Sequence, residues 1–368
     1  MVSTLAFTVT GLLVGAAFGF VLQRGRFCVN SAFREVLFED YTMFRAYLLA
    51  VVVTMIGANL LEDLHLLGHF EQGAFVAGTL YRQAFVPWAN IIGGYIFGMG
   101  IVLAGGCGSG ILYRVGEGNL AYVFAVFGFF FGIAMTKFGF LKSFYAWTIA
   151  PERIVWKGED TVPTLYNIIG VNKWIVIAVI SVVLLVATFK GSKPFVKAKK
   201  GYSWSLAGLL AGLIAVVAWW ASEYYGGKAR GLSFTGPLRE FFLAVFFGDY
   251  QNNPAAVNPV ESRNIFGMIF SWSSLYVLAV PLGAFISGKL LKEVKLKVPP
   301  ADELFKVLLG GFIMGIGAQM GGGCNIGHSL TGVSTLAVSS WVATIFIILG
   351  NWTMVYFVLI RPMRALDV

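Results

Sequence analysis

The sequence predicts an all-α, polytopic membrane protein with about nine transmembrane helices in two inverted repeats, with helix-breaking Gly-Gly-Cys elements at the centre. Three observations predict this fold class. Of the 368 residues, 58% are hydrophobic and only 12% are charged. Many apolar stretches approach the length of about 20 residues that a helix needs to cross about 30 Å of hydrocarbon. One segment rich in glycine also occurs twice, once in each half of the chain. Because a soluble fold has too little interior for so much apolar surface, lipid is the expected solvent.

Nine apolar segments have the length of transmembrane helices. They cover residues 5–22, 44–61, 89–106, 119–136, 172–189, 203–221, 265–287, 305–321 and 334–359. The first segment has no Lys or Arg before Arg24 and no cleavage site of small residues after a short apolar core. We therefore interpret it as the first span, and not as a cleaved signal peptide.

The net charge of +9 is expected to orient these spans. The connection after the fifth segment contains no acidic residue and carries Lys190, Lys193, Lys197, Lys199 and Lys200. Because basic loops stay in the cytoplasm, this loop and the C-terminus are predicted to be cytoplasmic and the N-terminus periplasmic. Counting the spans from that loop places the basic loop at residues 137–173 on the periplasmic side. We accept this conflict because long loops cross the membrane largely regardless of their charge. No nucleic-acid-binding motif accompanies the cations, so no nucleic-acid partner is predicted.

The repeat is visible as two segments that align without gaps. GMGIVLAGGCGSG, from Gly98 to Gly110, matches GIGAQMGGGCNIG, from Gly315 to Gly327, at five glycines and one cysteine. Five spans separate the starts of the two copies, so the copies are expected to have opposite orientations. We predict one transmembrane domain over residues 1–368, with repeat one at about 1–140, a connecting span at about 170–190 and repeat two at about 203–360.

The pairs Gly105-Gly106 and Gly322-Gly323 are predicted to interrupt helices at membrane depth. Glycine accepts a positive φ and lets the backbone approach a solute closely. In inverted-repeat transporters the substrate site lies at such interruptions near the membrane midplane. A helix that begins after each break directs its unpaired N–H groups and the positive end of its dipole toward an anion. We therefore assign all four glycines to the substrate site.

The three cysteines, Cys28, Cys107 and Cys324, are the strongest candidates for solute contacts. A neutral thiol is a weak donor and a weak acceptor, and a conducting path needs several weak sites. We expect the protonated thiols to hold a small sulfur-containing anion in turn. In the alignment of the repeats, Cys28 lies opposite Ser233. The cysteines form no CxxC pair, so they indicate neither a disulfide framework nor a redox centre.

Three other polar residues belong to the predicted substrate site. Arg24 either attracts an anion at the inner mouth or extends to the lipid headgroups. Asn325 follows Cys324 directly. His328 either faces the pathway or forms a hydrogen bond to a neighbouring helix. No metal site or cofactor is predicted, because His65 and His69 have suitable spacing but no third ligand.

Three motifs resemble the YeeE/YedE family of bacterial sulfur-transport membrane proteins. They are LQRGRFCVNSAFR, LAGGCGSGILYRVGEG and GGGCNIGHSLTG, in the order and wide spacing typical of the family. This resemblance covers nearly the whole chain and implies thiosulfate uptake across the bacterial inner membrane through an hourglass-shaped protein. It also implies that Cys28, Cys107 and Cys324 relay thiosulfate by S–H hydrogen bonds at a narrow waist, and that a small sulfurtransferase-like protein is a cytoplasmic partner. Some members are described as possible transporters of selenium compounds, so the solute stays open.

Other function classes fit the residues less well. An intramembrane thiol oxidoreductase needs an attacking and a resolving cysteine near a redox cofactor, so the chain is not expected to be an enzyme. A soft-metal transporter would bind Cu(I) through thiolates. A structural scaffold does not require two matched helix breaks. The chain has no GxxxxGK[ST] motif, which leaves channel-like, gradient-coupled and partner-driven transport open.

Overall fold

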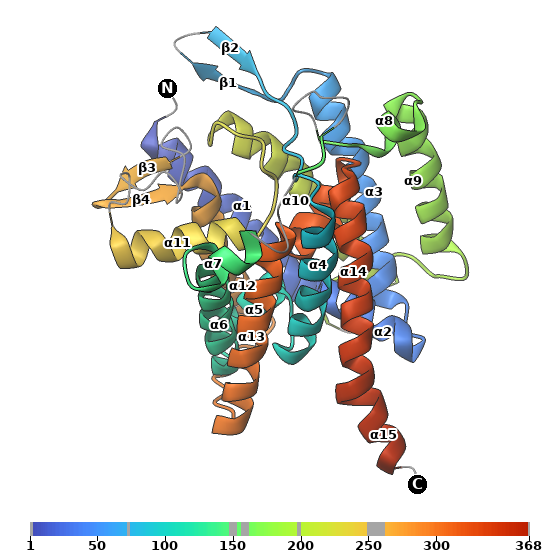
Figure 1. Cartoon of the computed structure of the whole chain (residues 1–368), viewed down its shortest axis with the longest axis vertical. Helices are drawn as coiled ribbons and strands as arrows, with labels where there is room; N and C mark the ends of the chain where they lie inside the picture. Colours follow the sequence, from blue (N-terminus) through green and yellow to red (C-terminus); the bar gives the residue numbers. More distant parts are fainter. Residues whose placement is uncertain are drawn as a thin grey trace.

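The computed structural model describes residues 3–71, 74–146, 153–155, 162–196, 200–248 and 262–366. Helices dominate this part of the chain (Figure 1). They are α1 (Thr4–Gly25), α2 (Val29–Glu35), η1 (Val36–Phe38), α3 (Thr42–Asp63), α4 (Pro87–Leu103), α5 (Gly108–Gly116), α6 (Leu120–Lys137), α7 (Leu141–Phe144), α8 (Leu165–Ile169), α9 (Lys173–Phe189), α10 (Trp204–Tyr224), α11 (Thr235–Phe247), α12 (Trp272–Leu290), α13 (Ala301–Gly321), η4 (Ile326–Gly332), α14 (Val338–Val355), η5 (Tyr356–Ile360) and α15 (Arg361–Leu366). Two antiparallel strand pairs complete it: β1 (Gly68–Glu71) with β2 (Ala74–Ala77), and β3 (Ser262–Ile265) with β4 (Met268–Ser271).

The predicted all-α, polytopic membrane fold is confirmed. Within the described ranges, 8 helical stretches are long and apolar enough to cross a membrane, and each overlaps a predicted segment. The remaining predicted segment, residues 172–189, forms α9, which has 17 residues. At 1.5 Å per residue, α9 is roughly 26 Å long. Val179, Val182 and Val183 on α9 are each 59–60% exposed, as expected for side chains that face lipid.

The predicted start of the seventh segment is wrong. Residues 265–271 are apolar, but they belong mainly to the β3–β4 pair. Gly267 has a φ of +80° at the turn, where its N–H donates to Asn264 Oδ1 at 3.0 Å. Helix α12 starts only after Ser271, whose hydroxyl accepts a hydrogen bond from the Ser274 N–H at 3.0 Å. Hydrophobicity alone does not distinguish such a strand from the first turns of a helix.

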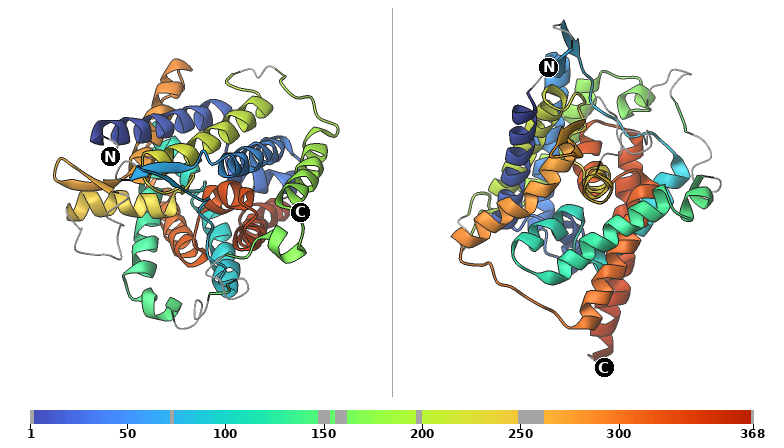
Figure 2. Two further views of the ribbon diagram at one scale, coloured as in Figure 1. Left: turned by 90° about the horizontal axis from the view of Figure 1, so that it is seen from above. Right: turned by 90° about the vertical axis from the view of Figure 1, so that its left-hand side faces the viewer.

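The two ends of the chain lie at opposite ends of the molecule (Figures 1 and 2). We call the end with the N-terminus and the β1–β2 pair the hairpin side, and the end with α15 the C-terminal side. Helix α4 begins on the hairpin side, and α5 continues toward the C-terminal side, where Gly118 contacts Lys295 and Lys297. Helices α13 and η4 run the opposite way, from the C-terminal side to the backbone contact of Ala337 with Thr164.

The long helices from the two halves of the chain interlock. Helix α1 packs on α12 and α10 on α3, while α4 packs on α14 and α13 on α6. Seen from above, α1 and α10 also lie side by side (Figure 2). Glycines permit the close approach: a Cβ on Gly98 would lie 2.2 Å from the Ile347 carbonyl oxygen, and one on Gly315 would lie 2.3 Å from that of Phe129. These two glycines are aligned in the repeat.

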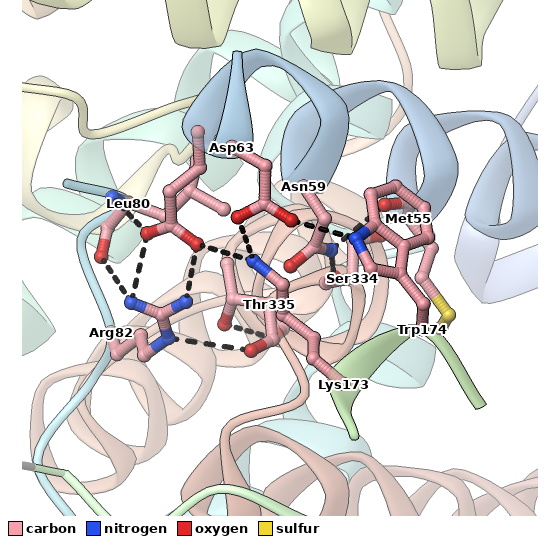
Figure 3. Close-up of polar contacts among 11 residues, drawn as sticks. Met55, Asn59, Asp63, Leu80, Arg82, Lys173, Trp174, Ser334 and Thr335 are labelled. Carbon is pink, nitrogen blue, oxygen red and sulfur yellow. Dashed lines mark hydrogen bonds and ion pairs between the residues drawn. The ribbon is translucent and has the colours of Figure 1, made fainter. Parts of the chain in front are cut away.

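A polar cluster joins α9 to α3 on the hairpin side (Figure 3). Lys173 Nζ lies 2.6 Å from Asp63 Oδ1 and 3.2 Å from Glu62 Oε2. The indole N–H of Trp174 donates to Asp63 Oδ2 at 2.7 Å. Arg82 donates to both carboxylate oxygens of Glu62, at 3.1 and 2.9 Å. Since these charges neutralise one another, the cluster fixes the connecting helix without exposing an unpaired charge at the end of a span.

Candidate functional site

Both predicted helix breaks are present. Helix α4 ends at Leu103 and α5 begins at Gly108, while α13 ends at Gly321 and the helical conformation resumes at Asn325. Gly105 has a φ of +72° and Gly322 a φ of +85°. This left-handed region is costly for residues with a Cβ, which explains the glycine at both positions. The two glycine pairs therefore interrupt two oppositely directed helices.

Each of the three cysteines stands at the start of a helical segment. The carbonyl oxygens of Cys28, Cys107 and Cys324 accept hydrogen bonds from the N–H groups four residues later, at 2.9, 2.8 and 2.7 Å. The side chains of Cys28 and Cys107 make no capping hydrogen bond to these helices. Because α5 directs its first N–H groups and the positive end of its dipole toward Cys107, the local field favours an anion there.

Two of the cysteines form a pair beside α5. A Cβ built on Gly110 would lie 3.1 Å from Cys28 Sγ and 3.7 Å from Cys107 Sγ. The two thiols therefore lie side by side against the same glycine. Cys107 Sγ also lies 3.4 Å from the Ser109 hydroxyl. All three cysteines of the chain are buried and free of disulfides.

The second half contains the equivalent pair. A Cβ on Gly327, the residue aligned with Gly110, would lie 2.9 Å from Ser233 Oγ and 3.9 Å from Cys324 Sγ. The N–H of Phe234 donates to Cys324 Sγ at 3.4 Å. Tyr276 fixes the Ser233 backbone, because its hydroxyl donates to the Ser233 carbonyl. A hydroxyl thus occupies the place that a thiol occupies in the first half.

Cavities approach these pairs from opposite sides. The hairpin-side cavity has a volume of about 260 Å³ and reaches Ser233, Gly322 and Gly327. Its wall also carries three basic residues and one acidic residue, which are Lys228, Arg230, Arg239 and Glu240. The C-terminal-side cavity has a volume of about 440 Å³ and reaches Gly105. Other polar residues of its wall are Asn30, Arg34, Tyr122, Asp302, Glu303 and Lys306.

The second glycine of each pair leaves space for a side chain of the following helical segment, which folds back and contacts the backbone at the helix break. His328 is buried, with Nε2 2.9 Å from the Gly321 carbonyl oxygen and Nδ1 3.1 Å from the Ser340 hydroxyl. A Cβ on Gly323 would lie 2.8 Å from the His328 ring. His328 is therefore held by neighbouring helices, the second of the two interpretations offered by the sequence.

In the first half, Arg114 takes the corresponding place. It donates hydrogen bonds to the Gly105 carbonyl and, at 3.2 Å, to the Tyr122 hydroxyl. A Cβ on Gly106 would lie 3.0 Å from Arg114 Nη1. Neither Arg114 nor Tyr122 was predicted from the sequence to be a site residue. The available signal was an arginine seven residues after Cys107, within an otherwise apolar stretch.

Asn325 and Arg24, two further predicted site residues, differ in their surroundings. Asn325 is fully buried beside Cys324, and neither its Oδ1 nor its Nδ2 has a hydrogen-bond partner in the described structure. Arg24 lines neither of the two cavities. Its guanidinium lies 5.2 Å from the ring centre of Phe20 and 5.7 Å from that of Tyr202. Asn325 thus adjoins Cys324 in the chain with an unpartnered amide, whereas Arg24 packs on two aromatic rings.

These features define the class of protein. Apolar helices of the required length surround two helix breaks, and cavities approach the breaks from opposite ends of the molecule. Such an arrangement is typical of polytopic membrane transporters. In the described ranges, no group of three or more His, Cys, Asp or Glu side chains is placed to hold a metal ion.

The chain belongs to the sulphur transport family, whose sequence model matches residues 24–353. It is 37% identical over 355 residues to the thiosulfate transporter TsuA of Spirochaeta thermophila, covering 94% of this chain and 98% of that protein. It is 32% identical over 374 residues to the thiosulfate transporter TsuA of Escherichia coli, covering 96% of each. A shorter match, 33% over 115 residues, relates 30% of the chain to 25% of the probable transporter YedE of Escherichia coli.

Proposed function

We propose that this protein takes up thiosulfate across the bacterial inner membrane and passes it along cysteine thiols at a narrow central waist. The observation that carries the proposal is the position of two matched pairs, Cys28 with Cys107 and Ser233 with Cys324, between cavities that open toward opposite ends. The names of the two nearly full-length relatives support thiosulfate as the solute.

The path begins in the hairpin-side cavity, where the basic side chains attract a dianion. The anion next meets Ser233 and Cys324, and then Cys28 and Cys107. Neutral thiols suit the soft terminal sulfur of thiosulfate and bind it weakly, so each step is reversible. The anion leaves through the C-terminal-side cavity. Every step is non-covalent, so the protein acts as a transporter and not as an enzyme.

Binding at the waist is expected to be weak, because the dianion loses its hydration shell. Oriented donors offset part of this cost. The N-terminus of α5 supplies N–H groups next to Cys107, and the unpartnered amide of Asn325 supplies further donors next to Cys324. A moderate affinity favours release as well as capture, as transport requires.

We assign the hairpin side to the periplasm and the C-terminal side to the cytoplasm. The basic loop after α9 supports this orientation through Lys190, Lys193 and Lys200, while Lys197 and Lys199 lie outside the described residues. Residues of about 1–140 and 203–360 then form two inverted copies, with α9 as the connecting span. A small sulfurtransferase-like protein that accepts thiosulfate at the cytoplasmic mouth is the expected partner.

Uptake of radiolabelled thiosulfate tests the function directly. In a bacterium without its own sulfate and thiosulfate importers, expression of this chain should restore uptake and growth on thiosulfate. Sulfate should compete poorly, because it lacks the terminal sulfur. No uptake of thiosulfate, together with uptake of another sulfur or selenium compound, would reassign the solute. Stoichiometric copper binding by the purified protein would instead favour the soft-metal alternative.

A further inference from the structure

At the level of the helix breaks, Arg114 has no carboxylate partner among the residues that the structure describes. It is partly buried on α5, and its guanidinium reaches back to the carbonyl of Gly105. Across the part of the chain that the structure describes, no acidic side chain lies within ion-pair distance of it, whereas Arg26, Arg34 and Arg82 all have such partners. A charge at membrane depth is costly and generally serves a function.

The groups that hold Arg114 are all neutral. The guanidinium donates to the Gly105 carbonyl and the Tyr122 hydroxyl, and lies 5.5 and 5.0 Å from the ring centres of Tyr113 and Tyr122. An anion accepts stronger, charge-assisted hydrogen bonds from a guanidinium than a carbonyl or a hydroxyl does. An arriving dianion can therefore displace both neutral acceptors, and the planar fork of donors suits an oxyanion.

The position of Arg114 is on the path. Gly105 and Tyr122 line the C-terminal-side cavity, while Arg114 itself does not. On its other side, Arg114 lies close to the glycine that contacts the thiols: a Cβ on Gly106 would lie 3.0 Å from Arg114 Nη1 and 3.3 Å from the carbonyl carbon of Gly110. The contact of Arg114 with Gly105 and Tyr122 thus separates the Cys28–Cys107 pair from the cavity through which we expect the anion to leave.

In the part of the second half that the structure describes, threonine takes the place of this arginine. Thr331 is the residue aligned with Arg114, and its hydroxyl donates to the carbonyls of Leu232 and Ile326 at 2.8 and 3.0 Å. It lines the hairpin-side cavity, which reaches Gly327 next to Cys324. The hairpin-side cavity therefore reaches Ser233 of the second pair, whereas the C-terminal-side cavity ends at the contact of Arg114 with Gly105 and Tyr122. Arginine in place of threonine accounts for this asymmetry.

We propose that Arg114 is the exit gate of the path: its guanidinium closes the way from Cys28 and Cys107 by binding Gly105 and Tyr122, and opens it by binding the oxyanion and swinging into the C-terminal-side cavity. This inference rests on the proposed uptake of an oxyanion. A purely structural role, in which Arg114 only caps the break as His328 does, is the competing explanation.

Two measurements on the same variants separate a gate from a structural cap. The variants are Arg114→Gln, Arg114→Lys and Tyr122→Phe, with Arg361→Gln in the exposed α15 as the control for loss of one charge. The first measurement is the rate of radiolabelled thiosulfate uptake at saturating concentration. The second is the rate at which a membrane-impermeant thiol reagent modifies the native cysteines from the C-terminal side, in inverted vesicles.

The gate predicts opposite changes in the two measurements. In Arg114→Gln, maximal uptake should fall about tenfold, as expected for the loss of charge-assisted hydrogen bonds, while modification of the thiols from the C-terminal side should rise about tenfold. Arg114→Lys should recover part of the uptake, because it keeps the charge. Tyr122→Phe should raise the modification rate, and Arg361→Gln should match the parent in both measurements.

A folded Arg114→Gln variant with parental uptake, or with an unchanged modification rate, would overturn the gate. If that variant does not reach the membrane, Tyr122→Phe decides alone, since an unchanged modification rate in it also excludes the gate. Because the modification rates need no thiosulfate, the proposed function can fail separately. If the proposed function is wrong but the gate is right, the parent protein takes up no thiosulfate, and the thiols still become accessible in the Arg114→Gln and Tyr122→Phe variants.

Discussion

At the scale of single residues, the structure as described contains a buried polar side chain next to Cys324 in the chain that makes no hydrogen bond. Asn325 is fully buried between Cys324 and η4, yet both ends of its amide lack a partner in the described structure. A buried polar group without a hydrogen bond costs about 1–3 kcal/mol. We infer that the protein bears this cost because the free amide of Asn325 can donate hydrogen bonds to the transported anion.

Replacing Asn325 by Leu should therefore separate stability from transport. The side chains have similar sizes, and the change removes two unpaired polar atoms, so the melting temperature in detergent should stay the same or rise. Thiosulfate uptake should fall, by about tenfold if one hydrogen bond to a charged solute is lost. Both quantities can be measured on the same preparation.

Asn90→Leu is the matched control for this prediction. Asn90 is equally buried, but its amide is fully used: its Oδ1 accepts from the Val86 N–H at 3.0 Å, and its Nδ2 donates to the Gly321 carbonyl at 2.9 Å. This variant should lose about 1–3 kcal/mol of stability. If Asn325→Leu were equally destabilised, or transported at the parental rate, a role of Asn325 in binding would be wrong.

The sequence pointed to the three thiols as candidates for solute contacts, which stays a prediction, but it did not show how they are grouped in space. Cys28 and Cys107 lie side by side only because α2 and α5 both begin at the waist, and spacing along the chain cannot show such a contact. Arg24 was predicted because it flanks Cys28 in the sequence and could attract an anion at the inner mouth, whereas its guanidinium packs on Phe20 and Tyr202. Arg114 was overlooked because its return to Gly105 depends on the turn after the break.

At the scale of helices, the interlocking of the two halves depends on small residues at the crossing points. Helix α13 packs on α6 so closely that a Cβ on Gly315 would lie 2.3 Å from the carbonyl oxygen of Phe129. A backbone atom at that distance cannot rotate away. The two helices must therefore separate to admit any larger residue.

Gly315→Ala should accordingly lower the stability of the folded protein by about 1–3 kcal/mol, as overpacking of a tight contact does. The melting temperature in detergent measures the effect. Gly236→Ala on α11 is the control, because the nearest atom to its added Cβ would be 3.9 Å away, which is ordinary contact. Equal melting temperatures for the two variants would contradict the close approach of α13 and α6.

Helix position was predicted well where the apolar segment was long and uninterrupted. The predicted segment 305–321 ends at the same residue as α13, because Gly322 forces the chain into the left-handed region. The segment 265–287 failed at its start, where the β3–β4 pair is apolar enough to resemble a span. The short helices α2 and α11 were not located, since neither is long enough for hydrophobicity to reveal it.

At the scale of the whole molecule, the orientation in the membrane can be tested by labelling. Leu66 on the hairpin side is 50% exposed, and Leu296, between α12 and α13 on the C-terminal side, is 81% exposed. With single cysteines introduced there, an impermeant thiol reagent should label Leu66→Cys in intact cells and Leu296→Cys only in inverted vesicles. The native cysteines are buried and should contribute little background. The reverse pattern would place the N-terminus in the cytoplasm.

Uptake of thiosulfate by cysteine variants shows whether the anion crosses the membrane along the thiols. The measurement is the initial rate of radiolabelled thiosulfate uptake, per amount of folded protein in the membrane, for the parent, Cys107→Ala and Cys324→Ala. Both side chains are small, and each substitution removes a single sulfur atom, so the fold should persist. We predict that the parent accumulates thiosulfate and that either variant loses most of the rate, about tenfold or more for the loss of one essential hydrogen bond to a charged solute. Parental rates in either folded variant would contradict the passage of thiosulfate along the thiols.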